Sequence, residues 1–264
     1  MKVIILAAGY ATRLYPLTLN QPKPLLPVAD KPMIEHVLDN LAPIAGLDQI
    51  YVVTNAKFAG HFRSWSKEYH RKQPKLPIKV CNDKSTDDKN KLGAIGDINF
   101  VIKQQKVDDD LIVVAGDNLF SDKLGDFGKF CRKKNAPVLA LYDVGNLEEI
   151  KKYNAINVDK TGRIKFFEEK PQQPTSTLTG IALYYYPRHT VPLIKQYIAE
   201  KNNPDQPGRL VQWLYPRTPF YTWRVPGLWF DIGSKETLVE ANEIFGKLKL
   251  KSKLEPKTNG KPKK

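Results

Sequence analysis

The chain has 264 residues, of which 41% are hydrophobic and 27% are charged. These proportions are typical of a globular protein and exclude a wholly disordered or fibrous chain. No stretch approaches the roughly 20 apolar residues of a membrane span, and the apolar run at residues 3–8 is too short for a signal peptide. We therefore expect a cytoplasmic protein without a membrane partner. Cys81 and Cys131 stand apart, outside any paired-cysteine metal motif.

Half of the net charge of +14 lies at the carboxyl end of the chain. Residues 247–264 contain eight lysines and one glutamate, together with two prolines and a glycine. This composition predicts a basic, disordered tail. The remaining charge of the body favours an anionic small-molecule substrate. Since no nucleic-acid-reading motif is present, we do not expect a nucleic-acid partner.

Apolar runs of strand length alternate with helical periodicity over the first 145 residues. Continuous apolar runs of this kind are typical of parallel strands that are buried on both faces. The strands are expected at 3–7, 50–54, 111–115 and 138–142, and the helices near 33–41, 94–102 and 124–131. This alternation predicts an α/β fold, namely a Rossmann-like, mixed but mainly parallel sheet flanked by helices.

The pattern changes after about residue 145 but shows no linker. Strands are expected at 164–167 and 179–186, and amphipathic helices at 191–198 and 238–245. In the run Tyr184, Tyr185 and Tyr186, strand alternation places Tyr185 on one face of the sheet and its neighbours on the other. We expect one fused domain over residues 1–246, with a nucleotide-binding half at about 1–145 and a substrate-binding half at about 146–246.

The loop after the first strand could bind phosphate groups. A small-residue loop at this place brings backbone N–H groups close to phosphate oxygens, and Arg13 adds a fork of donors. Lys23 stands in a segment stiffened by Pro22, Pro24 and Pro27. Taken alone, an ordinary strand-to-helix turn explains the glycine loop equally well.

Taken together, the motifs are more specific. They are the stretch 6–18, the stretch 22–28, Lys31-Pro32-Met33, Leu92-Gly93, Ala115-Gly116-Asp117-Asn118, Phe167-Glu168-Glu169-Lys170-Pro171, Thr179-Gly180 and Trp229-Phe230-Asp231-Ile232-Gly233. In order and spacing, the chain resembles the sugar-1-phosphate nucleotidyltransferases, or NDP-sugar pyrophosphorylases, such as glucose-1-phosphate thymidylyltransferase and mannose-1-phosphate guanylyltransferase. The resemblance covers nearly the whole body of the chain.

The resemblance implies a reaction in which an NTP and a sugar 1-phosphate give an NDP-sugar and pyrophosphate. It implies catalytic roles for Arg13, Lys23 and Asp117, and a Mg²⁺ site at Asp117 and Asp231. The implied nucleotide-binding residues are Leu6, Ala8, Gly9, Tyr10, Ala11, Thr12, Arg13, Lys23, Asn82 and Gly93. The implied sugar-phosphate-binding residues are Asn154, Glu169, Lys170 and Gly180. Independently, Asp117 follows a buried strand, at the edge where α/β sheets bind ligands.

The chain departs from the family pattern at three places. Ala11 stands where a second loop glycine is usual, and Asn154 stands where a glycine approaches the sugar, so its side chain is expected in the sugar pocket. The third place is the segment that begins at Asn82, where the Asn-Asp-Lys sequence resembles phosphocholine cytidylyltransferases. Asn82 could read a pyrimidine edge or be a turn residue.

These departures leave several alternatives open. dTTP or UTP is favoured as the nucleotide. One alternative is a phosphocholine cytidylyltransferase, in which Tyr185 or Trp223 would help to cage the ammonium group. Another is a non-catalytic NDP-sugar-binding regulatory protein. The oligomeric state is also open, with a homo-oligomer among the options.

Overall fold

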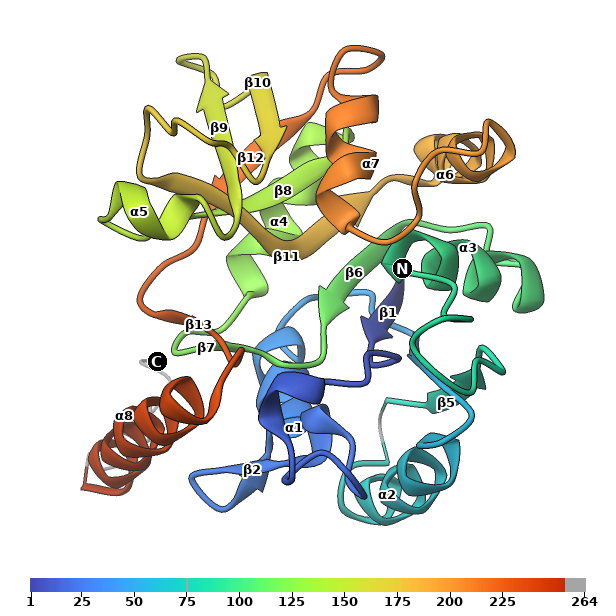
Figure 1. Cartoon of the computed structure of the whole chain (residues 1–264), viewed down its shortest axis with the longest axis vertical. Helices are drawn as coiled ribbons and strands as arrows, with labels where there is room; N and C mark the ends of the chain where they lie inside the picture. Colours follow the sequence, from blue (N-terminus) through green and yellow to red (C-terminus); the bar gives the residue numbers. More distant parts are fainter. Residues whose placement is uncertain (75, 255–264) are drawn as a thin grey trace, which may run out of the picture.

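The computed structural model describes residues 1–74 and 76–254, which form a central seven-stranded sheet (Figure 1). The strand order is β12–β8–β11–β6–β1–β4–β5. Their bounds are β1 Lys2–Leu6, β4 Gln49–Thr54, β5 Ile78–Asn82, β6 Leu111–Ala115, β8 Val138–Asp143, β11 Leu178–Tyr186 and β12 Tyr221–Arg224. Strand β11 is antiparallel to both of its neighbours, whereas the other ladders are parallel. The expected mixed, mainly parallel sheet is confirmed.

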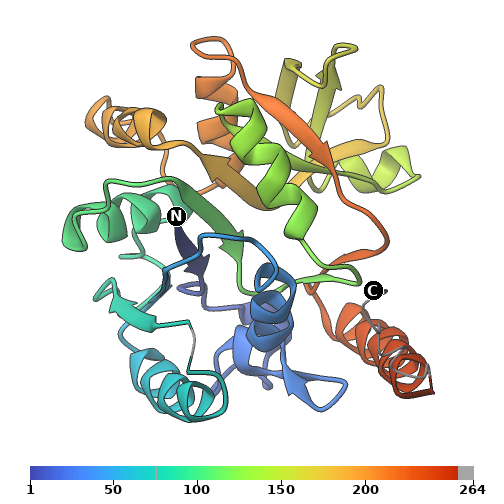
Figure 2. The ribbon, with the colours of Figure 1, turned by 180° about the vertical axis from the view of Figure 1, so that it is seen from behind.

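Helices cover both faces of this sheet (Figures 1 and 2). One face packs against α1 (Met33–Leu41), α2 (Ala59–Lys72) and α4 (Gly125–Lys134). The other packs against α3 (Ala94–Gln104), α6 (Val191–Ala199), α7 (Pro207–Leu214) and the hairpin of β9 (Asn154–Val158) and β10 (Ile164–Glu169). Because both faces are covered, the central strands are apolar throughout, which is why their sequences read as continuous runs.

The three consecutive tyrosines behave as strand alternation predicts. Tyr185 is buried on the face that carries α1, α2 and α4, whereas Tyr184 and Tyr186 are buried on the opposite face. Their rings therefore belong to the two hydrophobic cores.

The carboxyl-terminal helix corrects one expectation. Helix α8 spans Lys235–Leu254, so the disordered tail expected from residue 247 does not begin there. Ala241 and Phe245 pack near the small β2 (Pro27–Val28) and β3 (Lys31–Pro32) ladder, and Lys249 Nζ donates to Ala29 O at 3.1 Å. The apolar spacing predicted a helix only as far as residue 245, and the structure continues the same helix beyond that point. Residues 255–264 lie outside the described residues. In the part of the chain that the structure describes, no helix is long and apolar enough to cross a membrane.

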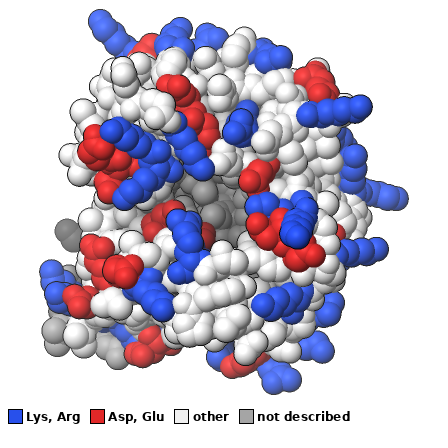
Figure 3. Space-filling view, viewed as in Figure 1, with Lys and Arg blue, Asp and Glu red and all other residues white. Residues whose placement is uncertain are grey.

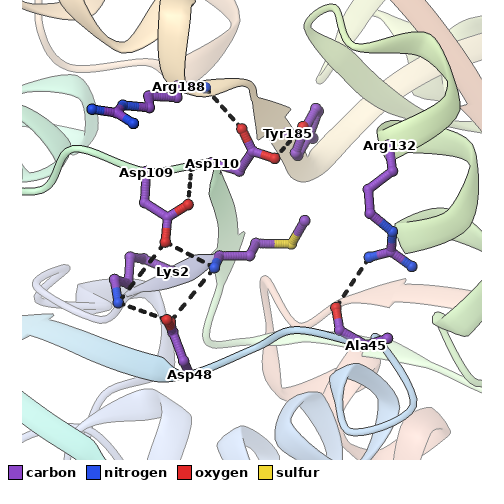
Figure 4. Close-up of polar contacts among 9 residues, drawn as sticks. Lys2, Ala45, Asp48, Asp109, Asp110, Arg132, Tyr185 and Arg188 are labelled. Carbon is purple, nitrogen blue, oxygen red and sulfur yellow. Dashed lines mark hydrogen bonds and ion pairs between the residues drawn. The ribbon is translucent and has the colours of Figure 1, made fainter.

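Polar contacts fasten the amino ends of the parallel strands (Figure 4). Lys2 Nζ donates to Asp48 at 2.8 Å, and the terminal amine of Met1 donates to Asp109 at 2.8 Å. The hydroxyl of Tyr185 donates to Asp110 at 2.8 Å, and the same carboxylate accepts the N–H of Arg188. This cluster lies at the end of the sheet opposite to the site described next.

Candidate active site

A cleft of about 390 Å³ opens at the carboxyl ends of the parallel strands. It is lined from the loop after β1 and from the end of β6, and the chain order reverses between these two strands. Open α/β sheets bind ligands at such a switch point. In Figure 3, acidic and basic side chains surround the hollow at the centre of this face.

The structure brings nine of the sequence-predicted residues to the wall of this cleft. They are Leu6, Ala8, Gly9, Gly93, Asp117, Asn154, Glu169, Gly180 and Asp231. The other predicted residues, Tyr10, Ala11, Thr12, Arg13, Lys23, Asn82 and Lys170, do not line it, although Lys23 and Arg13 lie beside its acidic end. The two halves of the domain therefore contribute to one cavity.

The acidic end of the cleft holds Asp117, Asp231 and Lys23. Two short strands, β7 (Asn118–Phe120) and β13 (Trp229–Asp231), pair so that Asp231 lies opposite Asn118, the neighbour of Asp117. Lys23 Nζ forms an ion pair with the Asp117 carboxylate, and these side chains are only 11% and 24% exposed. Burial and the nearby charge of Asp117 raise the pKa of Asp231 above its ordinary value, whereas Lys23 and Arg13 oppose that shift.

The loop after β1 places Arg13 close to this cluster. Ala11 adopts a left-handed backbone with φ of 48°, the conformation for which the usual glycine is suited, and its carbonyl accepts the hydroxyl of Thr18 at 2.8 Å. A side chain at Gly233, two residues after Asp231, would lie 3.8 Å from the Arg13 guanidinium. Arg13 is exposed and reaches toward the loop that carries Asp231.

Another part of the cleft wall lies at the start of α3. Gly93 has φ of 77°, and a Cβ there would lie 2.7 Å from Asp205 Cα, so this position requires glycine. The N–H groups of Ala94 and Ile95 donate to the carbonyls of Asp205 and Pro204. The first turn of α3 is thus capped by the 204–205 segment, a contact that sequence reasoning missed because it joins distant residues.

Asn82 takes the turn role. Its Oδ1 accepts the N–H of Lys84 at 2.8 Å, while the following Asp83 accepts both the N–H and the hydroxyl of Ser85. Asp97 lies near Asp83 and lines the cleft, and sequence reasoning missed it. Burial and the charge of Asp83 raise the pKa of Asp97 to about 8. An aspartate in the first turn of a helix is common, because it interacts favourably with the helix N-terminus. The sequence therefore held no indication that Asp97 and Asp83 lie close together.

Glu169, at the end of β10, lines the cleft, and its carboxylate is packed against α7. Its Oε2 is buried and has no hydrogen-bond partner among the described residues. Burial raises the pKa of Glu169, and the charges of Lys170 and Arg209 oppose the shift. Lys170 is exposed and has φ of 51°, so the chain turns sharply just after Glu169. A buried, unpaired carboxylate in a cleft is suited to accept a ligand's hydroxyl group.

Asn154 differs from the expectation for its position. It lies in a strand, and its side chain lines the cleft, but both ends of its amide bond the backbone of Gly180, at 2.7 and 2.8 Å. Trp229, Tyr153 and Tyr184 also line the cleft and were not predicted. Trp229 Nε1 donates to Asn118 Oδ1 at 2.9 Å and so braces the loop that carries Asp117.

The aromatic residues considered for an ammonium cage lie elsewhere. Tyr185 is 1% exposed, and Trp223 packs edge-on against Phe127. Both belong to or pack against the core on the face of α1 and α4. That expectation is wrong, because strand alternation directs both side chains away from the cleft.

The acidic end has the donor set that Mg²⁺ prefers. Among residues 1–74 and 76–254, no group of three His, Cys, Asp or Glu side chains is placed to hold a metal. Mg²⁺ commonly takes only one or two protein carboxylates and completes its shell with phosphate oxygens and water. Asp117 and Asp231 face the cleft, and their mutual repulsion, seen in the raised pKa of Asp231, would be relieved by a divalent cation. The residues present therefore fit Mg²⁺.

Comparison with known proteins agrees with this architecture. The chain is 27% identical over 245 residues to the bifunctional protein GlmU of Methanocaldococcus jannaschii, covering 93% of this chain and 54% of that protein. It is 28% identical over 186 residues to the UTP–glucose-1-phosphate uridylyltransferase AglF of Haloferax volcanii, covering 70% of this chain and 72% of that protein. The chain thus spans about half the length of the first of these relatives.

Solved structures share the fold. A crystal structure of UDP-glucose pyrophosphorylase complexed with UDP-glucose matches with a TM-score of 0.78 and 24% identity, over 93% of this chain and 98% of the other. The family model for the nucleotidyl transferases matches residues 2–247. Because that match takes in the whole sheet, both halves of the cleft and most of the described chain, the protein belongs to the nucleotidyl transferase family.

Proposed function

We propose that this protein transfers a nucleotidyl group from an NTP to a sugar 1-phosphate, with Mg²⁺, and releases pyrophosphate. One observation carries the proposal: a single cleft joins the Lys23–Asp117–Asp231 cluster at one end to the unpaired carboxylate of Glu169 at the other. The first end has the charges suited to a nucleotide's phosphates, and the second suits a polyhydroxylated substrate. Residues 1–145 would bind the nucleotide and 146–246 the sugar phosphate.

The reaction forms a bond between the sugar-phosphate oxygen and the α-phosphorus and breaks the bond from that phosphorus to the β-phosphate oxygen. Negative charge grows on the α-phosphate and on the departing pyrophosphate. Catalysis by positioned cations needs no covalent intermediate. Lys23, held beside Asp117, would stabilise the α-phosphate, and Arg13 would hold the pyrophosphate at the exposed mouth.

Asp117 and Asp231 would hold Mg²⁺, which when bound neutralises phosphate charge. With the carboxylates engaged in this way, the ammonium of Lys23 is free to turn from Asp117 toward the phosphates. The half-buried setting of the cluster strengthens these charge interactions, since water screens them less than at the surface.

The sugar phosphate would lie against Glu169, Lys170 and Gly180. Glu169 would accept a hydroxyl of the sugar, and the exposed Lys170 would bind its phosphate. The positions of Tyr185 and Trp223, which lie outside the lining of the cleft, favour a sugar phosphate over phosphocholine. For the nucleotide we propose UTP or dTTP, a choice supported by the uridylyltransferase name of a relative.

The test is pyrophosphate release with Mg²⁺, measured for five NTPs against a panel of sugar 1-phosphates and phosphocholine. Release with UTP or dTTP and one sugar 1-phosphate is the expected outcome. Release only with CTP and phosphocholine would show that phosphocholine, and not a sugar 1-phosphate, is the substrate. Nucleotide binding without release in any combination would contradict catalysis and support a regulatory role.

A further inference from the structure

The side chain of Asn154 joins the start of β9 to the start of β11. Its Nδ2 donates to Gly180 O at 2.8 Å, and its Oδ1 accepts the Gly180 N–H at 2.7 Å. A primary amide offers the same donor and acceptor as a peptide group. The two hydrogen bonds between the Asn154 amide and the Gly180 backbone therefore resemble those of one hydrogen-bonded residue pair in a β-ladder. Asn154 is only 8% exposed, so these bonds are shielded from water.

The bond is made where β11 loses its regular pairing. Gly180 pairs with Leu141 of β8, but the next paired residue is Tyr184, opposite Leu139, which marks a register shift. A Cβ at Gly180 would lie 2.3 Å from a methyl group of Leu139, so a side chain at this position would require Leu139 to move. Such irregularities re-aim a strand beside a site. Asn154 supplies a partner to the Gly180 N–H, and the Gly180 carbonyl accepts from both Asn154 and, at 3.4 Å, the hydroxyl of Thr179.

Asn154 also lies directly opposite Glu169 in the β9–β10 ladder. The hairpin has only two strands, and a two-stranded hairpin is marginally stable without further attachment. The Asn154–Gly180 pair attaches this hairpin to the central sheet at the end where Glu169 enters the cleft. At its other end the hairpin is held by the N–H of Ile164, which donates to Phe220 O at 2.8 Å, so the Asn154 amide is the side-chain attachment nearest to Glu169 among the described residues.

We propose that Asn154 is a positioning residue of the sugar-phosphate subsite, which holds Glu169 and Gly180 in place through its amide. Its two bonds to Gly180 use one N–H of Nδ2 and one lone pair of Oδ1, and together they fix the plane of the amide. This inference rests on the proposed function.

The first test is Asn154→Ala in pyrophosphate-release assays. We expect the KM for the sugar 1-phosphate to rise by about tenfold or more, because a displacement of about 1 Å can cost up to about 100-fold. The KM for the NTP should stay within about twofold, since the nucleotide end is built from other elements. Asn157→Ala, an exposed asparagine on the same strand, is the matched control and should behave as wild type. An unchanged KM for the sugar phosphate in Asn154→Ala would overturn the proposal.

A double-mutant cycle separates positioning from general loosening. If Asn154 acts through Glu169, the Asn154→Ala/Glu169→Ala variant should be little worse than Glu169→Ala alone. If the two substitutions raise the KM for the sugar 1-phosphate independently, so that their effects multiply in the double variant, Asn154 does not act through Glu169. An equal rise of the KM for the NTP would lead to the same conclusion.

Hydrogen exchange gives a readout that does not need turnover. The Gly180 amide should exchange slowly in wild type and at least about tenfold faster in Asn154→Ala. Asn154→Asp keeps an acceptor for that N–H but sets an oxygen against the Gly180 carbonyl, so it should retain protection yet raise the KM. If Asn154→Ala fails to fold, wild-type KM values in Asn154→Asp would contradict the proposal. Wild type without any turnover would refute the proposed function, while the exchange result would still decide whether Asn154 holds Gly180.

Discussion

The Glu169 carboxylate occupies the space that a side chain at Gly208 would fill. A Cβ at Gly208 would lie 1.9 Å from Glu169 Oε2 and 2.9 Å from its Cδ. Gly208 lies in the first turn of α7, whereas Glu169 ends β10. Helix α7 thus leaves room for the carboxylate to lie buried within the cleft wall.

This relationship predicts the effect of Gly208→Ala. The added methyl group would displace Glu169, and we expect the KM for the sugar 1-phosphate to rise by about tenfold or more. Gly246→Ala is the control, since a Cβ there meets no atom within 4 Å and alanine favours a helix by about 1 kcal/mol. Equal kinetics in both variants would mean that Glu169 does not need its observed position.

Removing the cation beside Asp117 should slow the chemical step. We expect Lys23→Ala to lower kcat by about 100-fold or more, because charge stabilisation in the transition state has this weight. Lys31→Ala removes another partly buried ion pair, to Asp39, outside the cleft, and should leave kcat unchanged. Pyrophosphate release measures both. Turnover of Lys23→Ala close to that of wild type would remove Lys23 from the proposed mechanism.

The acid pair beside α3 predicts a pH dependence of stability. The pKa of Asp97 is raised to about 8 by burial and the charge of Asp83. A carboxyl with a raised pKa stabilises the fold fully below about pH 4, and this stability is lost as the pH rises through about 8. Each unit of the shift corresponds to about 1.4 kcal/mol. Urea unfolding should show wild type losing stability from pH 5 to pH 9, and Asp97→Asn should lose clearly less. Parallel pH profiles would contradict this.

Two adjacent tyrosines predict opposite effects of removing a hydroxyl group. Tyr185→Phe removes the hydrogen bond to Asp110 and should lower the free energy of unfolding by about 1–3 kcal/mol. The hydroxyl of Tyr186 is buried without a partner among residues 1–74 and 76–254, so Tyr186→Phe should be neutral or stabilising. Denaturant unfolding measures both. Equal losses would show that the Asp110 bond contributes little.

The sequence by itself determined five of the seven strands of the central sheet, the faces of its tyrosines and the family, whereas β5 and β12 were not predicted. Strand and helix periods are local, and a strand buried on both faces must be apolar throughout, as β1 and β6 are. The small-residue loop after β1 and the two acidic motifs could also be read from sequence, because their residues lie within short stretches of the chain.

Only the tertiary structure decided which side chains meet. Gly180 is the partner of Asn154, 26 residues away, and Gly208 makes room for Glu169. At the start of α3, Asp205 packs against Gly93, which is also far from it in the sequence. The partner of a polar side chain depends on how strands and helices dock, and docking is driven by apolar burial that does not specify individual polar pairs. For this reason the sequence predicted an Asn154 side chain that faces the substrate, whereas in the fold its amide bonds the backbone of Gly180.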